Sequence, residues 1–180
     1  MSEALDLLIG IEPLGARTQL TLRGDLGAGA MGAAVDKAVG LGMPPVLGVV
    51  HDGAARAVWM SPDELLLVNG AGGVTDPLVR VGEQLVEAHH MALDVSDARS
   101  LLRLTGPLVG EVLAKGVPCD CSDRGFPAGT ARRTHLAGLA VGIWRLDAET
   151  WELVCFRSYA HHLVAWLRQA AVPGSEVGYF

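Results

Sequence analysis

Residues 93–116 read LDVSDARSLLRLTGPLVGEVLAKG, and the fold that we predict from the sequence is built around this stretch. It begins as a strand, crosses a short acidic turn and runs on as a second strand. In that strand Leu102 and Leu104 alternate with polar residues, which is typical of a strand with one buried face. Gly106 and Pro107 end the strand, and apolar residues at helical spacing then predict an amphipathic helix. The stretch is therefore a strand–glycine–helix unit.

The composition indicates a globular chain with a sizeable core. Of its 180 residues, 50% are hydrophobic and only 19% are charged. These values disfavour disorder and fit one domain, or two small halves that share a core. The net charge of −6 and the scattered Lys and Arg residues argue against a nucleic-acid-binding protein, which would show a basic face. We therefore expect no nucleic-acid partner.

The cysteines and the N-terminal sequence bear on the compartment. Cys119, Cys121 and Cys155 leave one thiol without a partner, which favours a reducing compartment. The sequence MSEALDLLIGIEP is acidic and its apolar run is short, so it predicts neither a signal peptide nor a membrane span. The expected localisation is the cytoplasm, with no membrane partner.

Periodicity and turn residues predict the other elements. Before the opening stretch we expect a strand (18–24), a helix capped by Asp25 that runs to about residue 41, strands (46–50, 55–60 and 64–69), a loop (71–75) and a helix (76–90). After it we expect a loop (117–130), a long strand or bent pair of strands (134–146), a strand (151–156) and a helix (158–170).

An internal repeat relates the two parts of the chain. LTLRGD at residues 20–25 matches LRLTGP at 102–107, and Trp59 with the strand after it matches Trp144 with the strand after it. The predicted fold class is α+β, with two approximate strand–helix–strand–strand–helix repeats and mainly antiparallel sheets covered by helices. The predicted organisation is a lead-in segment (1–17), a single domain (18–170, with halves 18–90 and 93–170) and a C-terminal tail (171–180).

The motif GAGAMG at residues 27–32 has the form G-x-G-x-x-G and follows a predicted strand. In a dinucleotide-binding fold such glycines admit a pyrophosphate to a helix N-terminus, and Asp52 would hold a ribose. However, the preceding strand alternates, whereas a buried parallel strand would be continuously apolar. The equivalent helix after Gly106 has no such motif. Helix packing of small residues is the favoured interpretation, and dinucleotide binding is the alternative.

Three groups of side chains could carry chemistry. Cys119, Cys121 and His135 suggest zinc, but structural zinc sites use longer spacers and a second pair. The adjacent pairs His89-His90 and His161-His162 point about 100° apart on a helix and do not chelate naturally. In the acidic turn, the cluster of Asp94, Ser96, Asp97 and Arg99 fits turn capping and a solvated ion pair as well as catalysis. The tryptophans favour core packing, with an interface as the alternative: Trp59, Trp144, Trp151 and Trp166.

The opening stretch resembles a known signature. Folate-binding aminomethyltransferases of the glycine cleavage system carry an Asp–hydrophobic–Ser turn, a strand ending in Gly-Pro and then a helix, as residues 94–116 do. A closer resemblance is to the gamma-subunit family of heterotetrameric sarcosine oxidases. The similar segments cover most of residues 18–170 in order: LTLRGD, WMSPDELLLV, DVSDARSLLRLTGP, EVLAKG, PCD, RGFPAGT and WRLDAETWELVCFRSYAHHLVAWL.

The resemblance implies a folate-binding-like domain within an oxidoreductase complex. Such a complex demethylates sarcosine oxidatively to glycine, passes the one-carbon unit to tetrahydrofolate and forms hydrogen peroxide. The implied partners are alpha, beta and delta subunits, and the implied cofactors of those other subunits are FAD, FMN, NAD, tetrahydrofolate and zinc.

The same resemblance implies that this chain is not the catalyst. In aminomethyltransferases a catalytic Asp lies on the strand that aligns with LAGLAVGIWRL, and Leu139 and Ala140 stand here where carboxylates would. We therefore expect no catalytic, cofactor-binding or metal-binding residue in this chain. The alternatives are a small dinucleotide-binding protein that uses GAGAMG and a stand-alone folate-binding assembly factor.

Overall fold

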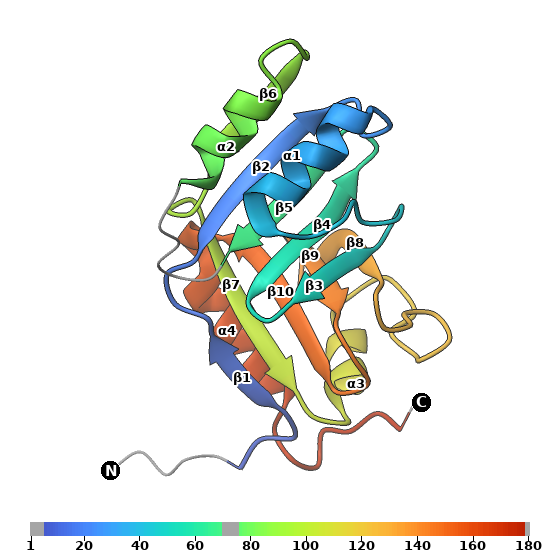
Figure 1. The fold of residues 1–180 in the computed structure, drawn as a ribbon. Coiled ribbons are helices and arrows are strands. Elements are labelled where there is room, and N and C mark those ends of the chain that lie inside the picture. The colour runs from blue at the N-terminus through green and yellow to red at the C-terminus, as the bar shows by residue number, and fades with distance from the viewer. Residues whose placement is uncertain (1–5, 70–75, 179–180) are drawn as a thin grey trace.

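A computed structural model describes residues 6–69 and 76–178. The first part of the chain forms β1 (Gly10–Pro13), β2 (Thr18–Gly24), α1 (Gly29–Val39), β3 (Val49–Asp52), β4 (Ala55–Ser61), β5 (Glu64–Asn69), α2 (Pro77–Gln84) and β6 (His90–Asp94). The second part forms β7 (Arg99–Thr105), α3 (Val109–Ala114), β8 (Ala131–Leu136), β9 (Leu139–Arg145), β10 (Thr150–Phe156), a 3₁₀ turn η1 (Arg157–Tyr159) and α4 (Ala160–Ala170) (Figure 1). The predicted loop 71–75 lies outside the described residues.

The strands form two five-stranded sheets with equivalent strand orders. One sheet has the order β3-β4-β5-β2-β6, and the other has the order β8-β9-β10-β7-β1. Every ladder between these strands is antiparallel. The α+β class with antiparallel sheets is therefore confirmed. Each sheet has one strand more between its two helices than the predicted strand–helix–strand–strand–helix pattern.

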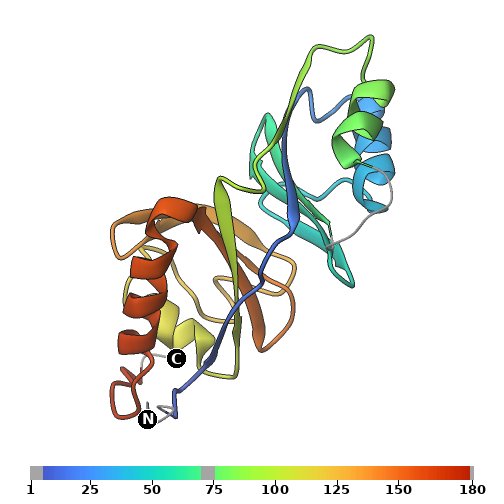
Figure 2. The ribbon, with the colours of Figure 1, turned by 90° about the vertical axis from the view of Figure 1, so that its left-hand side faces the viewer.

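The edge strands are exchanged between the two halves of the chain. β1 precedes β2 in the chain but pairs with β7, whereas β6 precedes β7 but pairs with β2. Figure 2 shows the consequence, because the blue N-terminal chain and the green-to-yellow chain both cross from one lobe to the other. Neither half completes its sheet without a strand from the other half.

The two sheets meet through their inner faces, and helices cover their outer faces. Leu20, Leu22, Leu65 and Leu67 pack outward against α1 and α2, and the corresponding residues of the other sheet pack against α3 and α4. The layer between the sheets contains Val58, Met60, Leu66, Val95, Leu101, Trp144 and Val154. Since both faces of the central strands are covered, these strands bury polar residues that would be exposed to solvent in a sheet with one open face.

Several predicted boundaries are wrong for identifiable reasons. Asp25 does not cap α1, because its carboxylate accepts a hydrogen bond from the N–H of Gly27 (2.9 Å) and so closes a turn before the helix. The helix opened by Asp76 forms, but it ends at Gln84 rather than near residue 90. Residues 85–87 form a turn, and His90, where the predicted helix would end, begins β6 and pairs with β2.

At the N-terminal end, part of the predicted lead-in segment is a strand. Gly10–Pro13 pairs with β7 and places Ile11 opposite Leu104. The segment is only four residues long and ends in Pro13, so its own sequence carries little strand signal. Its hydrogen bonds come from a strand about ninety residues further along the chain.

The predicted equivalence of Trp59 and Trp144 is wrong by one residue. Trp59 pairs with Leu65 and packs on the side of α1 and α2. Trp144 pairs with Glu152 and lies fully buried between the sheets. Because side chains alternate along a strand, a shift of one residue moves a side chain to the opposite face.

Candidate functional site

A buried ionic cluster joins the two sheets. Glu152 of β10 is 1% exposed and accepts two hydrogen bonds from Arg56 of β4, one from Nε (2.8 Å) and one from Nη2 (2.9 Å). Arg103 donates a third hydrogen bond (3.0 Å) and the indole N–H of Trp144 a fourth (2.8 Å). The carboxylate therefore receives charged donors from both sheets, with Arg56 in the bidentate geometry of strong carboxylate pairs.

The environment of Glu152 favours its ionised form. Burial alone would raise the pKa of its carboxyl, but the hydrogen bonds and positive charge of Arg56, with those of Arg103 and Trp144, hold the pKa below its usual value. Both carboxylate oxygens accept two hydrogen bonds each. This arrangement can fix the position of the two sheets, but it leaves Glu152 a poor proton acceptor for a reaction.

A second carboxylate, Glu64, lies near the mouth of the layer between the sheets. It forms longer ion pairs with Arg133 (3.5 Å) and Arg99 (3.8 Å). It borders a cavity of about 500 Å³ that also includes His135, Ala140 and Phe156. Burial lowers the pKa of Arg99 although the charge of Glu64 opposes that shift, and its Nη1 is a buried donor without a hydrogen-bond partner among the described residues.

The acidic turn of the opening stretch is held by its own side chains. The carboxylate of Asp94 accepts hydrogen bonds from the N–H and the hydroxyl of Ser96. The Ser96 oxygen accepts the N–H of Gln19 (2.9 Å), which ties β6 and β7 to the start of β2. Asp97 pairs with Arg157 at 3.4 Å on the surface. The cluster therefore stabilises the turn between β6 and β7 and connects that turn to the start of β2.

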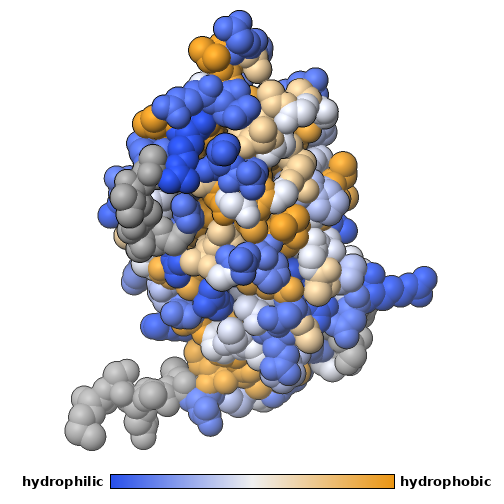
Figure 3. Space-filling view, viewed as in Figure 1, coloured by the Kyte–Doolittle hydropathy of each residue, from blue (hydrophilic) through white to orange (hydrophobic). Residues whose placement is uncertain are grey.

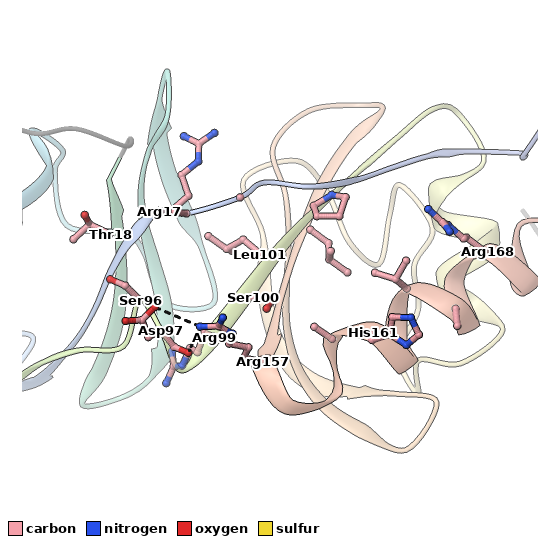
Figure 4. Close-up of a pocket in the computed structure, with 17 residues that line it drawn as sticks. Arg17, Thr18, Ser96, Asp97, Arg99, Ser100, Leu101, Arg157, His161 and Arg168 are labelled. Atoms are coloured by element: carbon pink, nitrogen blue, oxygen red, sulfur yellow. Dashed lines mark hydrogen bonds and ion pairs between the residues drawn. The ribbon is translucent and has the colours of Figure 1, made fainter. Parts of the chain in front are cut away.

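A groove of about 830 Å³ lies beside this turn (Figure 4). Three segments form it: the segment that leads into β2 and carries Arg17, the turn that carries Asp97, and helix α4, which carries His161 and Arg168. The groove contains four arginines and one aspartate, and its floor is apolar. It is larger than the cavity at Glu64, and Arg99 lines both.

The GAGAMG segment does not form a dinucleotide site. Its strand, β2, lies between two antiparallel neighbours, whereas the dinucleotide fingerprint belongs to a parallel strand–helix–strand unit. Asp52 ends β3, which is separated from β2 by two other strands. A β-carbon at Gly29 or Gly32 would meet no atom within 4 Å, so neither residue is required for a close approach. The small-residue helix interpretation fits this geometry.

The cysteines and histidines are placed in different regions. Burial raises the pKa of Cys121 to about 12, with Cys119 adding to the shift, and Cys119 borders a different cavity from His135. Among residues 6–69 and 76–178, no three His, Cys, Asp or Glu side chains are grouped as a metal site requires. His90 begins strand β6 rather than ending a helix, while His161 and His162 are exposed on α4.

The tryptophans pack at different depths. Trp144 and Trp151 are fully buried, whereas Trp59 and Trp166 are partly buried against the cores. In the part of the chain that the structure describes, no helix is long and apolar enough to cross a membrane.

Comparison with known proteins identifies the family. The model of the sarcosine oxidase, gamma subunit family matches residues 23–173. The chain belongs to this family. A sarcosine oxidase subunit gamma of Corynebacterium sp. (strain P-1) is 35% identical over 158 residues, which are 85% of this chain and 75% of that protein. The subunit gamma of an Arthrobacter sp. is 32% identical over 142 residues, or 77% and 68% of the two chains.

Solved structures agree with the gamma-subunit assignment. A chain of the heterotetrameric sarcosine oxidase from Corynebacterium sp. U-96, in complex with pyrrole 2-carboxylate, superposes with a TM-score of 0.82 and 32% identity, covering 93% of this chain and 85% of that chain. The glycine cleavage system aminomethyltransferase T from Bartonella henselae gives a TM-score of 0.65 at 13% identity, covering 89% and 45%. The second likeness concerns the fold alone, and it is consistent with a folate-binding-like fold.

The positions that the sequence analysis aligned with catalytic carboxylates lie at the start of β9. Leu139 is partly buried against the outer core, and the backbone carbonyl of Ala140 accepts a hydrogen bond from the Tyr159 hydroxyl (3.0 Å). Neither side chain can ionise or donate a hydrogen bond. In this member of the gamma-subunit family, these positions serve packing and support of η1.

The Glu152 cluster was not predicted from the sequence. Its signal was present, because Arg56 and Glu152 are each a single charge within a run of apolar strand residues, ARAVWM and WELVCF. A charge at such a position is either exposed or paired in the core. Alternation separates the two faces of a strand without showing what covers each one, and here a second sheet packs over the face that carries the charges.

Proposed function

We propose that this chain is a non-catalytic gamma subunit that assembles with alpha, beta and delta subunits of a heterotetrameric sarcosine oxidase-type complex. In this proposal the complex demethylates sarcosine oxidatively to glycine, transfers the one-carbon unit to tetrahydrofolate and forms hydrogen peroxide. The observation that carries the proposal is the likeness to a chain of a heterotetrameric sarcosine oxidase, with a TM-score of 0.82 over 93% of this chain.

The hydrogen bonds that engage Glu152 and Ser96 support a structural role for this chain. The carboxylate of Glu152 is saturated by Arg56, Arg103 and Trp144, and Ser96 is engaged by Asp94 and Gln19. Catalytic acids, bases and nucleophiles need groups whose protonation state can change near the working pH and whose reactive atom is accessible. These groups, which the sequence or the geometry singles out, do not meet that condition.

We further propose that the flavins FAD and FMN, NAD, tetrahydrofolate and zinc are held by the other subunits. For tetrahydrofolate, the residues of this chain do not fit the catalytic pattern of the fold, because Leu139 and Ala140 offer no carboxylate at the aligned positions. For zinc, the raised pKa of Cys121 opposes the thiolate that the metal would require.

Expression with and without the other subunits tests the proposal. We expect the isolated chain to bind no flavin and to give no sarcosine-dependent hydrogen peroxide. Co-expression with alpha, beta and delta subunits of a sarcosine oxidase should give a complex that contains the chain and oxidises sarcosine. Peroxide formation by the isolated chain, or an active complex that excludes the chain, would contradict the proposal. Activity of the assembled complex on another N-methylated amino acid, but not on sarcosine, would correct the substrate alone.

A further inference from the structure

We propose that the groove between α4 and the crossing segments is the docking site for an acidic, extended segment of a partner subunit. This inference rests on the proposed function, since it requires that the chain assembles with other subunits. It concerns the groove of about 830 Å³ drawn in Figure 4. We infer this occupant from the positive charge of the groove, its weakly paired guanidinium groups and its open shape.

The charge of the groove is opposite to that of the whole chain. Four arginines line it, namely Arg17, Arg99, Arg157 and Arg168, against the single carboxylate of Asp97. The chain as a whole carries a net charge of −6 and has only 14 Lys and Arg residues. A concentration of guanidinium groups on an acidic protein attracts anionic segments and repels the same groove of a second copy.

Within the described part of the chain, one of these guanidinium groups is unpaired, and two others have only long, weak contacts. Arg168 has no hydrogen bond or ion pair among the described residues, and the bond of Arg17 to the Leu14 carbonyl is long, at 3.4 Å. The pair between Arg157 and Asp97 is solvent-exposed and equally long. Arg99 also lines the groove, but its guanidinium forms an ion pair with Glu64 (3.8 Å) in the neighbouring cavity. The exposed guanidinium groups of Arg157 and Arg168 favour an anionic occupant, because guanidinium binds carboxylate in a planar, bidentate geometry.

The walls of the groove suit an extended polypeptide. Ala16, before β2, and Ala165, on α4, line the groove and are exposed, and such small side chains allow another backbone to approach. Leu101 and Val164 supply an apolar floor for alternate side chains. A small-molecule site would enclose most of its ligand. Here the exposure of Gly15, Ala16, His161 and Ala165 leaves the groove open along its length.

The groove is also preorganised. The backbone N–H of Leu14 donates to the carbonyl of Leu101, and that of Gln19 donates to the Ser96 hydroxyl oxygen. These bonds hold the segment before β2 against β7 and the acidic turn. A partner segment therefore binds without ordering the walls, which lowers the entropy lost on association.

The first experiment compares two charge-reversal variants of equal net charge. Arg157→Glu with Arg168→Glu reverses two exposed groove arginines, and Lys37→Glu with Arg124→Glu reverses two exposed cations outside the groove. Association with the co-expressed partner subunits is followed at low and high salt, after thermal melting has shown that both variants fold. We expect the groove variant to associate about tenfold more slowly at low salt, with a smaller difference at high salt, and the control to match the unmodified chain.

The outcomes separate this inference from the proposed function. If the unmodified chain does not assemble with the partner subunits, the proposed function fails. If it assembles but the groove variant and the control behave alike, the docking proposal alone fails. A small anion as occupant would appear as stabilisation of the isolated chain by succinate that the groove variant loses while assembly is unchanged, and that result would overturn the polypeptide proposal.

A photo-crosslinking residue identifies the occupant directly. p-Benzoylphenylalanine in place of Ala165, which is exposed on α4 at the groove, should crosslink to an Asp- and Glu-rich segment of another subunit in the assembled complex. A crosslink to a second copy of this chain, to a segment without acidic residues, or to no segment of an assembled complex contradicts the proposal.

Discussion

Arg56 and Glu152 form a bidentate ion pair that links the two sheets across their buried inner faces, with Nε–Oε2 and Nη2–Oε1 distances of 2.8 and 2.9 Å. Arg56 lies on β4 and Glu152 on β10, so the residues are 96 positions apart in the chain. Both side chains are almost fully buried, at 4% and 2% exposure. The pair therefore fixes how one half of the chain faces the other.

Truncation of one partner should destabilise the chain strongly. Glu152→Ala leaves the charges of Arg56 and Arg103 and the indole N–H of Trp144 without their acceptor. A broken buried pair of this kind lowers the free energy of unfolding by about 3–5 kcal/mol. Urea denaturation monitored by tryptophan fluorescence measures the change. A loss below about 1 kcal/mol would show that solvent reaches the cluster.

Two comparisons separate charge from packing. The double variant Arg56→Met with Glu152→Leu should lose less stability than the summed losses of Arg56→Ala and Glu152→Ala. It removes both charges of the pair and keeps the buried volume. Asp97→Ala, which removes the exposed partner of Arg157, should leave the denaturation midpoint unchanged. Additive losses in the first comparison would mean that the pair contributes no coupling.

The depressed pKa of Glu152 predicts a loss of stability in acid. The native state keeps the carboxyl ionised at pH values where the unfolded chain, with an ordinary Glu pKa of 4.5, is protonated. The unfolded state then binds more protons, so the free energy of unfolding falls as pH drops below 4.5 towards the native pKa, and the contribution is complete above 4.5. Urea denaturation as a function of pH should show this slope. Glu152→Gln should reduce it, while a surface variant such as Glu87→Gln should not.

Gly116 and Trp166 set a second test, in the outer core. A β-carbon on Gly116 would lie 2.6 Å from Cη2 of Trp166 and 3.0 Å from Cδ1 of Leu136. Gly116→Ala therefore overpacks the contact between the end of α3 and helix α4, and it should destabilise the chain by about 1–3 kcal/mol. Replacing Trp166 with Leu in the same chain should recover part of the loss, since the indole ring is the obstacle. Calorimetric unfolding of the single and double variants measures both effects.

A matched glycine provides the control for that test. Gly82 lies inside α2, and a β-carbon there would meet no atom within 4 Å. Gly82→Ala should raise the free energy of unfolding by up to about 1 kcal/mol, because alanine loses less backbone entropy in a helix. If both alanine variants destabilise equally, the contact with Trp166 does not explain the effect at Gly116.

The local periodicity of apolar residues predicts much of the fold. The strand at Thr18–Gly24 and the strand–turn–strand–helix order of residues 93–116 follow from alternating apolar residues and from Gly and Pro at the ends. β1 and the pairing of β6 could not be predicted in the same way. Both strands pair with the other half of the chain, and the hydrogen bonds that define these pairings depend on residues that are distant in the sequence.

The buried ionic cluster around Glu152 could not be predicted from the sequence. Glu152 and Val154 lie on the face opposite Trp151 and Leu153, and the second sheet buries that face. Alternation indicates that a strand has two different faces, and it does not say what covers the second one. The family resemblance, by contrast, depended on the order of several segments and was confirmed over residues 23–173.

The GAGAMG segment gives a last test, because its two interpretations predict opposite results for the same variants. In the structure Gly29 begins α1 and Gly32 lies within it, each with open space where a β-carbon would stand. Gly32→Ala should therefore stabilise the chain by up to about 1 kcal/mol, and Gly29→Ala should be neutral or stabilising. Titration of the unmodified chain with NAD and with ADP-ribose, followed by thermal shift, should give no change. Micromolar binding that Gly29→Ala abolishes would instead establish a nucleotide site on a helix that follows an antiparallel strand.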